Sequence, residues 1–177
     1  MTNAEDDILV RRALQADPES FEHLCRRYYS SLIAVADSIL MDRHLAEDAA
    51  QEALACTCRQ LPRLRRPERF GPWVMAICRN VAKDMLRDRM RQREPVEDHR
   101  PQDRAPQDGD TQGEVLTEAL RQLPQRLREV VFLRFYDGMS YEQMAKILGA
   151  TPQSIDGRLR RAKKQIAAFM RTNGFES

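Results

Sequence analysis

The chain has 177 residues, enough for one ordinary domain or two small ones. Hydrophobic residues make up 42% and charged residues 32%, which is typical of a folded protein with a core. No run approaches eighteen apolar residues, so we expect no membrane insertion. The N-terminus is acidic and polar with no long apolar segment after it, so we expect no secretory signal and a cytoplasmic protein with reduced cysteines.

The composition favours helices throughout the chain. Leu, Ala, Arg, Glu and Gln dominate, all of them good helix formers, whereas aromatic residues make up only 6%. No segment alternates β-branched and polar residues as a strand does. We therefore predict an all-α protein.

Four helices are predicted in the N-terminal part. The first spans about residues 4–15. Asp17 and Pro18 then have the form of an N-cap followed by proline at the first helical position. A stripe of apolar residues follows at three- and four-residue steps: Phe21, Leu24, Cys25, Tyr28, Leu32, Val35 and Ile39. A third helix is predicted over about 42–60 and a fourth from about residue 67, with its own apolar stripe, so we expect a compact helical bundle.

Residues 94–113 differ from what precedes and follows them. This segment, EPVEDHRPQDRAPQDGDTQG, contains three prolines, two glycines and no apolar residue larger than Val96. Such a segment cannot bury enough surface to offset the entropy lost on ordering. We predict a flexible acidic linker over 94–113, with a stretched reach of roughly 70 Å, between an N-terminal bundle at 1–93 and a second domain at 114–177.

The second domain contains the pattern of a helix-turn-helix. Two helices are predicted first, on either side of Pro124, with Leu127, Val130, Val131 and Phe135 buried by the second. Ser140 and Gln143 then have capping-box form, Gly149 marks a turn, and Thr151 with Pro152 begins a basic last helix. A short helix, a turn and a longer basic helix form the unit that enters the major groove of DNA. A helical hairpin with a charged outer face is the structural alternative, and the combined pattern favours DNA binding.

Two basic blocks suggest two contacts with a polyanion. Residues 63–93 carry ten basic and three acidic side chains, and residues 151–171 carry six basic and one acidic. The first block also contains Phe70 and Trp73, and aromatic rings beside cations suit single-stranded nucleic acid, whose unpaired bases stack. Both rings also lie on the apolar stripe, where packing in the core is the more common role.

An acidic patch is predicted at the middle of the third helix. Glu47, Asp48, Gln51 and Glu52 share one face of that helix, which charge alone would explain as a solvated surface. The chain shows no phosphate-binding glycine loop and no nucleophile beside a base, and its three histidines lack metal spacing. Cys56 and Cys58 point in different directions on a helix. We therefore predict no enzyme activity, no cofactor and no metal.

Together these segments resemble the extracytoplasmic-function sigma factors of the sigma-70 family. Residues 21–29, 46–52 and 70–84, the last beginning Phe70-Gly71-Pro72-Trp73, are similar to sigma region 2. Residues 123–134, 140–145 and 158–163 are similar to sigma region 4. The resemblance covers about 130 residues in the order of the family. It implies a sigma factor that directs core RNA polymerase to promoters and helps to open the −10 region.

The resemblance also implies a role for each surface. The four residues of the acidic patch would bind the clamp of the polymerase β′ subunit, and region 4 would meet the β flap. The residues implied at the −10 element are Arg63, Arg65, Arg66, Phe70, Trp73, Asn80, Lys83 and Arg87. Those implied at the −35 element are Thr151, Gln153, Ser154, Gly157, Arg158, Arg160, Arg161 and Lys163. Family members are commonly held inactive by an anti-sigma factor, which is the remaining expected partner.

Two departures and two alternatives accompany this hypothesis. Asp156 and Gly157 stand where the family often has a basic residue and a serine. A conventional helix-turn-helix regulator would bind duplex DNA without polymerase, but it would not explain the acidic patch together with the basic and aromatic block. An adaptor that never touches DNA would not explain the two basic blocks.

Overall fold

The computed structural model describes residues 3–92 and 111–175. These contain eight α-helices and two short 3-10 helices, with no strand among the described residues, which confirms the predicted all-α class. No helix among them is long and apolar enough to cross a membrane. Most of the predicted linker lies outside the described residues, and its last three residues already belong to a helix, because α5 begins at Thr111.

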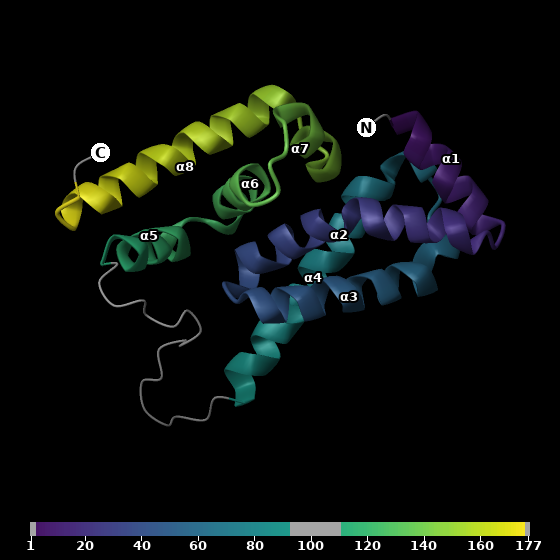
Figure 1. Cartoon of the computed structure of the whole chain (residues 1–177), viewed down its shortest axis with the longest axis horizontal. Helices are drawn as coiled ribbons and strands as arrows, with labels where there is room; N and C mark the ends of the chain where they lie inside the picture. Colours follow the sequence, from purple (N-terminus) through teal and green to yellow (C-terminus); the bar gives the residue numbers. More distant parts are fainter. Residues whose placement is uncertain (1–2, 93–110, 176–177) are drawn as a thin grey trace.

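Four helices form the N-terminal half (Figure 1). They are α1 (Asn3–Leu14), α2 (Pro18–Leu40), α3 (Arg43–Gln60) and α4 (Phe70–Gln92), with the 3-10 helices η1 (Leu61–Arg63) and η2 (Pro67–Arg69) between the last two. The Asp17 side chain caps α2 by accepting hydrogen bonds from the backbone N–H groups of Glu19 and Ser20. The fourth helix was predicted to begin near Pro67. Its first turn is the 3-10 helix η2, and the α-helical part begins three residues later, at Phe70.

The core of this half is built around α2. Leu24, Leu32 and Val35 have no exposed surface, and they pack with small residues of α3 such as Ala46 and Ala53. Small side chains let two antiparallel helices approach closely. The C-terminal part of α2, residues 31–40, is buried on every side, which the single apolar stripe did not predict. A helix buried all round needs a further covering element.

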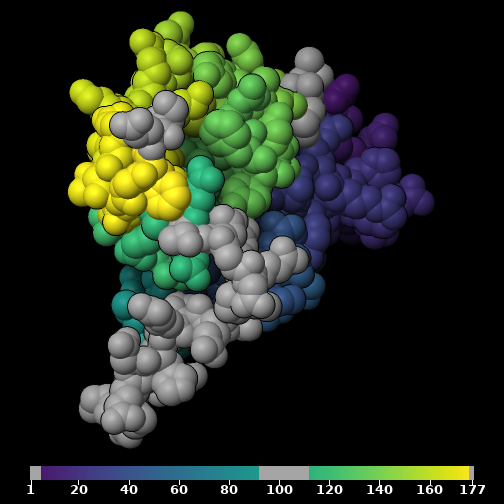
Figure 2. Space-filling view, turned by 60° about the vertical axis from the view of Figure 1, so that its left-hand side comes forward, coloured from purple at the N-terminus to yellow at the C-terminus, as the bar shows by residue number. Residues whose placement is uncertain are grey.

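The second half supplies that element. It consists of α5 (Thr111–Gln122), α6 (Gln125–Phe135), α7 (Tyr141–Leu148) and α8 (Pro152–Thr172). Figure 1 shows α6 lying between α8 and α2, so α6 is the helix that covers α2. In Figure 2 the green helices of the second half lie directly against the blue N-terminal helices. The buried apolar residues of both halves form one continuous cluster.

Local sequence signals explain the helix-turn-helix well. Ser140 and Gln143 make both hydrogen bonds of the predicted capping box at the start of α7. Gly149 ends α7 with a φ of 62°, which glycine adopts without strain. Thr151 caps α8 through the Ser154 N–H. One prediction in this half is wrong: Phe135 is 61% exposed, because it lies at the last turn of α6 and lines an open groove between α5, α6 and α8.

Candidate nucleic-acid and polymerase interfaces

The outer face of α8 is basic and open. Ile155, Leu159 and Ala162 are buried against the other helices, so the opposite side of α8 faces outward. That side exposes Gln153, Arg160, Arg161 and Lys164. Thr151 is also exposed. Ser154, Gly157 and Arg158 belong to the same surface and are half-buried. A helix whose first turns carry Gln and Arg has the groups that read adenine and guanine in a major groove.

Several basic side chains of α8 already have partners within the chain. Arg160 forms an ion pair with Asp156, one turn earlier. Arg161 donates from Nε to the Gly157 carbonyl oxygen at 3.1 Å. Lys163 lies to one side, with its Nζ 5.8 Å from the centre of the exposed Phe135 ring. Lys163 is therefore less well placed for DNA than the other predicted residues of this helix.

A second basic surface runs from the end of α3 into α4. Arg63, Arg65 and Arg66 are exposed in the segment between α3 and α4, and no ion pair of theirs is found among the described residues. Along α4, Asn80 and Arg87 are exposed and Lys83 is half-buried. Arg87 pairs with Asp84 at 2.5 Å, one turn away. The predicted cations of this block thus share one accessible region.

The two aromatic rings of this block differ from each other. Phe70 is only 2% exposed and packs edge-on against Tyr28, with ring centres 5.3 Å apart. It is a core residue, so the prediction that it contacts the −10 strand is corrected: a ring enclosed by other side chains cannot stack on a base. Trp73 is half-buried and tilted against Phe70 at 6.0 Å, which leaves part of its ring accessible.

Arg79, the neighbour of Asn80 in α4, is directed away from the exposed basic surface. Its Nε donates to Glu129 Oε1 of α6 at 2.7 Å, and the Glu129 side chain is only 6% exposed. The pair therefore joins the two halves of the chain. Sequence analysis missed the role of Glu129, because its partner Arg79 lies 50 residues away in the chain and only the packing of the two halves brings the two together. A charged residue inside an apolar run was the only available signal.

Other polar groups cross the same interface. Ser31 of α2 donates to Asp137, in the turn after α6, at 2.7 Å. Arg128 of α6 donates to the Ser38 carbonyl oxygen of α2 and to the Arg121 carbonyl oxygen at the end of α5. Burial of this guanidinium lowers the pKa of Arg128. The polar contacts fix α6 against α2 in one position, which apolar packing alone does not do.

The helix-turn-helix also contacts the N-terminal half. A Cβ added at Gly149 would lie 3.7 Å from the Pro72 ring, and one added at Gly71 would lie 3.6 Å from the Ile147 backbone. The start of α4 and the end of α7 are therefore in van der Waals contact. In this arrangement the two halves, and with them the two basic surfaces, are packed together.

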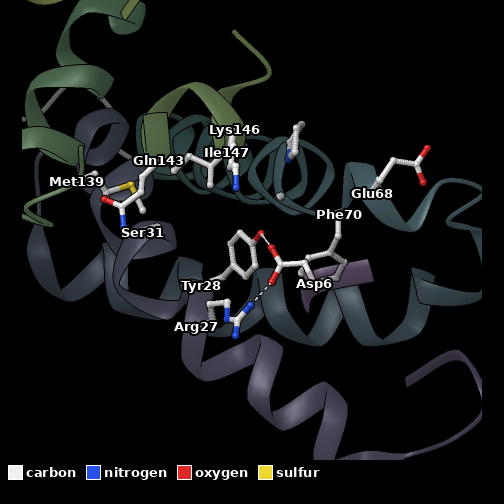
Figure 3. A pocket seen from close by; sticks show the side chains of 12 residues that line it. Asp6, Arg27, Tyr28, Ser31, Glu68, Phe70, Met139, Gln143, Lys146 and Ile147 are labelled. Atoms are coloured by element: carbon white, nitrogen blue, oxygen red, sulfur yellow. Dashed lines mark hydrogen bonds and ion pairs between the residues drawn. The ribbon is translucent and has the colours of Figure 1, made fainter. Parts of the chain in front are cut away.

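A small pocket opens where α1, α2, α4 and α7 meet (Figure 3). On one side, Asp6 of α1 accepts hydrogen bonds from the Tyr28 hydroxyl at 2.7 Å and from Arg27 at 2.5 Å. Burial, and then the Asp6 carboxylate, raise the pKa of Tyr28 well above its usual range, so the hydroxyl keeps its proton. The opposite wall, with Gln143 and Ile147, comes from α7. These contacts of Asp6 tie α1 to α2.

The acidic patch of α3 is accessible as predicted. Asp48, Gln51 and Glu52 are exposed and Glu47 is half-buried, with Ala46, Ala49 and Ala53 buried beneath them. Glu52 accepts from Arg59 at 2.9 Å, and the hydrogen bond from Arg59 lowers the pKa of this carboxyl. The Glu52 carboxylate thus keeps its charge at neutral pH on an accessible surface of α3.

An apolar groove marks the far end of the second half. It lies between α5, α6 and α8 and has a volume of about 480 Å³. Leu116, Phe135 and Tyr136 line it and are each more than 40% exposed. Its remaining apolar walls are Leu120, Val131, Ile166, Ala167, Met170 and Phe175. Single exposed apolar residues are ordinary, but a contiguous apolar groove is typical of a site that receives a partner.

Among the described residues, no group of His, Cys, Asp and Glu could hold a metal ion. Cys58 is exposed, Cys25 and Cys56 are half-buried, and Cys78 is buried and donates to the Leu32 carbonyl oxygen. Burial raises the pKa of Cys78 to about 12, so this thiol is inert at neutral pH.

Comparison with known families agrees with the two halves of the fold. Sigma-70 region 2 matches residues 24–92, and sigma-70 region 4 matches residues 113–166. An ECF RNA polymerase sigma factor, EcfG of Rhodopseudomonas palustris, is 30% identical over 149 residues that cover 82% of each chain. The chain belongs to the ECF sigma factors of the sigma-70 family. It directs RNA polymerase to promoters, and the conventional helix-turn-helix regulator is not favoured.

Other similarities follow the same pattern. The RNA polymerase sigma-H factor of Pseudomonas aeruginosa is 28% identical over 182 residues, with 94% of both chains covered. The solved structure of the sigma factor RpoE from Bartonella quintana, in complex with the anti-sigma factor NepR, matches with a TM-score of 0.58. It is 24% identical and covers 86% of this chain and 98% of its own. At that identity the likeness shows that the two chains share a fold.

Proposed function

We propose that this sigma factor divides its work among three surfaces on different helices. The outer face of α8 reads duplex DNA at the −35 element, the basic segment before α4 and the exposed face of α4 hold the −10 strand, and the acidic patch of α3 binds the polymerase clamp. The observation that carries the proposal is that all three sets of side chains lie outside the buried core, either exposed or half-buried.

Reading at −35 depends on the first turns of α8. Gln153 and Arg158 are the groups suited to base edges, Gln to adenine and Arg to guanine. Arg160 and Arg161 supply phosphate contacts, which position the helix without specifying sequence. To contact a phosphate, Arg160 must break or share its ion pair with Asp156. An ion pair at the surface contributes little free energy in water, so this costs little.

Opening at −10 depends on the other basic surface. Arg63, Arg65 and Arg66 attract the phosphates of the melted strand, while the accessible part of Trp73 offers a face on which an unpaired base stacks. Asn80 and Lys83 continue this surface along α4. Phe70 supports Trp73 from the core and makes no contact with DNA itself.

Two protein partners fit the remaining surfaces. The acidic patch of α3 meets the β′ clamp through complementary charge, and the apolar groove of α5, α6 and α8 receives an apolar segment of the β flap. An anti-sigma factor in the cytoplasm would hold the protein inactive. Its support is that a chain of the same fold was solved with an anti-sigma factor bound.

The contact between the two halves must open during promoter binding. The −10 and −35 elements lie about 25 base pairs apart, or roughly 85 Å along DNA at 3.4 Å per pair. In the closed arrangement α4 touches α7, so α4 and the helix-turn-helix cannot reach both elements at once. Core polymerase therefore binds the halves separately, and each then contacts its own element.

Permanganate footprinting of promoter thymines tests this division. We expect Asn80→Ala and Lys83→Ala to impair strand opening on an ordinary promoter and to recover on a template already melted at −10. Equal defects on both templates would mean that α4 makes only general phosphate contacts. Arg158→Ala serves as the matched control, because its defect at −35 should persist on the pre-melted template.

A gel-shift assay on the free chain distinguishes a sigma factor from a regulator that binds DNA without polymerase. The free chain should bind duplex promoter weakly, because each half offers a small surface and polymerase supplies the effective concentration that links them. Tight, specific binding by the free chain at physiological salt would contradict the proposal.

A further inference from the structure

One glycine in the DNA-facing helix has no role in the fold. Gly157 lies in the second turn of α8, where glycine is the weakest helix former after proline. A Cβ built there would meet no atom within 4 Å, and its φ is not in the left-handed range. The four other glycines whose surroundings are described each have a reason, namely a positive φ or, for Gly71, the Tyr28 hydroxyl 3.0 Å from the added Cβ.

The position of Gly157 on the helix is equally distinct. It is two residues from both Ile155 and Leu159, about 200° around the helix axis from each. Both of those side chains are buried, so Gly157 stands at the crest of the outward face. The residues one and two turns away on that crest are Gln153, Arg160, Arg161 and Lys164, all of them exposed. A bare patch of backbone is thus surrounded by long polar side chains.

Two of these side chains have partners within the helix, and neither lies within 4 Å of the place that a Cβ on Gly157 would take. Arg160 pairs back with Asp156, and Arg161 donates to the Gly157 carbonyl oxygen. That carbonyl is therefore occupied, and the Gly157 N–H is used in the helix by its position past the first turn. What the patch offers to a ligand is only the Cα–H surface, which is small and apolar.

We propose that the bare crest at Gly157 receives the 5-methyl group of a thymine in the −35 major groove, and that the absence of a side chain there sets this base preference. The thymine methyl is the one apolar group that a base pair shows in that groove. The proposal rests on the proposed reading of −35 by α8. Gly157 is then a specificity-determining residue, retained although alanine would suit the helix better.

The test uses holoenzyme and the −35 element that it selects from a randomised pool. Each thymine of this element is replaced in turn by deoxyuridine, which lacks the methyl group, and binding is measured for the natural chain and for Gly157→Ala. We expect one replacement to weaken the natural holoenzyme about fourfold, the effect of losing one buried methyl. Gly157→Ala should weaken binding to the thymine promoter about tenfold, because the added methyl would overlap the space that the thymine methyl takes beside bare backbone. Deoxyuridine at that position removes the overlap, so its effect on this variant should be smaller than on the natural chain.

Two controls separate this inference from the proposed function and from unfolding. Gly157→Ala should not lower the melting temperature, because alanine favours the helix. Gln165→Ala, exposed on the same helix but outside the crest, should bind as the natural chain does. An intact −35 footprint with no sensitivity to any thymine methyl, or with unchanged binding by Gly157→Ala, would overturn the role of Gly157 alone. Absence of any −35 footprint would overturn the proposed function as well.

Discussion

The contact between the two halves and the outward faces of α4 and α8 use the same kinds of residue in opposite ways. At the contact, Arg79 and Glu129 are largely removed from water and paired at 2.7 Å across elements 50 residues apart. On the outward faces, arginines are exposed and pair with a carboxylate one turn away or with none that is found among the described residues. A charge at the contact therefore supports the closed fold, whereas a charge on the outward face contributes little to folding and remains available to a ligand.

The largest effect on stability is expected for Phe70, the aromatic residue that its neighbours enclose. Phe70→Ala should lower the free energy of unfolding by roughly 3–5 kcal/mol, because it removes a buried ring and leaves a cavity. Chemical denaturation measures this. Arg66→Ala is the control and should stay within about 0.5 kcal/mol, since Arg66 is exposed. If Phe70→Ala is as stable as the natural chain and is defective only in promoter opening, Phe70 contacts DNA and the core role assigned to it is wrong.

Breaking the pair between the halves should have the next largest effect. Glu129→Ala leaves Arg79 partly buried without its carboxylate, at a cost of roughly 2–3 kcal/mol. This value is below that of a fully buried pair, because 23% of the Arg79 side chain stays exposed. The double variant Arg79→Leu, Glu129→Leu should recover most of the loss in the same denaturation experiment. If Glu129→Ala is as stable as the natural chain, the contact does not hold the halves together.

Arg158 is expected to affect binding but not folding. Arg158→Ala should weaken recognition at the −35 end by roughly 1–3 kcal/mol if Arg158 makes a bidentate contact with a base. Its thermal unfolding should be unchanged within about 0.5 kcal/mol. Binding competition between promoters that differ only at −35 measures the first quantity. Equal loss on all promoter sequences would make Arg158 a phosphate contact.

The acidic patch should show the smallest effect on stability together with a complete loss of one partner. Asp48→Arg combined with Gln51→Ala reverses charge on an exposed face, so native helicity should be kept. The variant should no longer co-elute with core polymerase, because like charges would then face each other. A variant that is folded and still co-elutes would show that the clamp binds elsewhere.

Local signals in the sequence predicted the elements of this fold better than their arrangement. Asp17, Ser140 and Thr151 cap helices as expected because capping depends on a few neighbouring residues. The contact between the halves could not be predicted, because it joins residues far apart in the chain. Glu129 and Arg79 each read as ordinary charged residues until α6 is placed on α2.

The candidate sites divide in the same manner. The exposure of Asp48, Gln51 and Arg160 follows from helix periodicity, which opposes them to buried neighbours. Phe70 and Trp73 share one stripe, and only tertiary packing decides that Phe70 is enclosed while Trp73 is partly accessible. The apolar groove was also missed, because Phe135 continues the buried periodicity of α6, and only tertiary packing leaves a space between α5, α6 and α8 beside it.

Energy transfer between one dye on each half tests most directly whether a closed chain opens to contact two promoter elements. The dyes are attached at Glu68→Cys and Lys146→Cys, two exposed positions that line the same pocket from the two halves, in a chain in which Cys25, Cys56 and Cys58 are serine. Cys78 can remain, because its pKa of about 12 keeps the buried thiol unreactive. High transfer in the free chain and low transfer in holoenzyme on promoter DNA is the predicted result. Equal transfer in both states would contradict the account, since the halves would then stay together on the promoter.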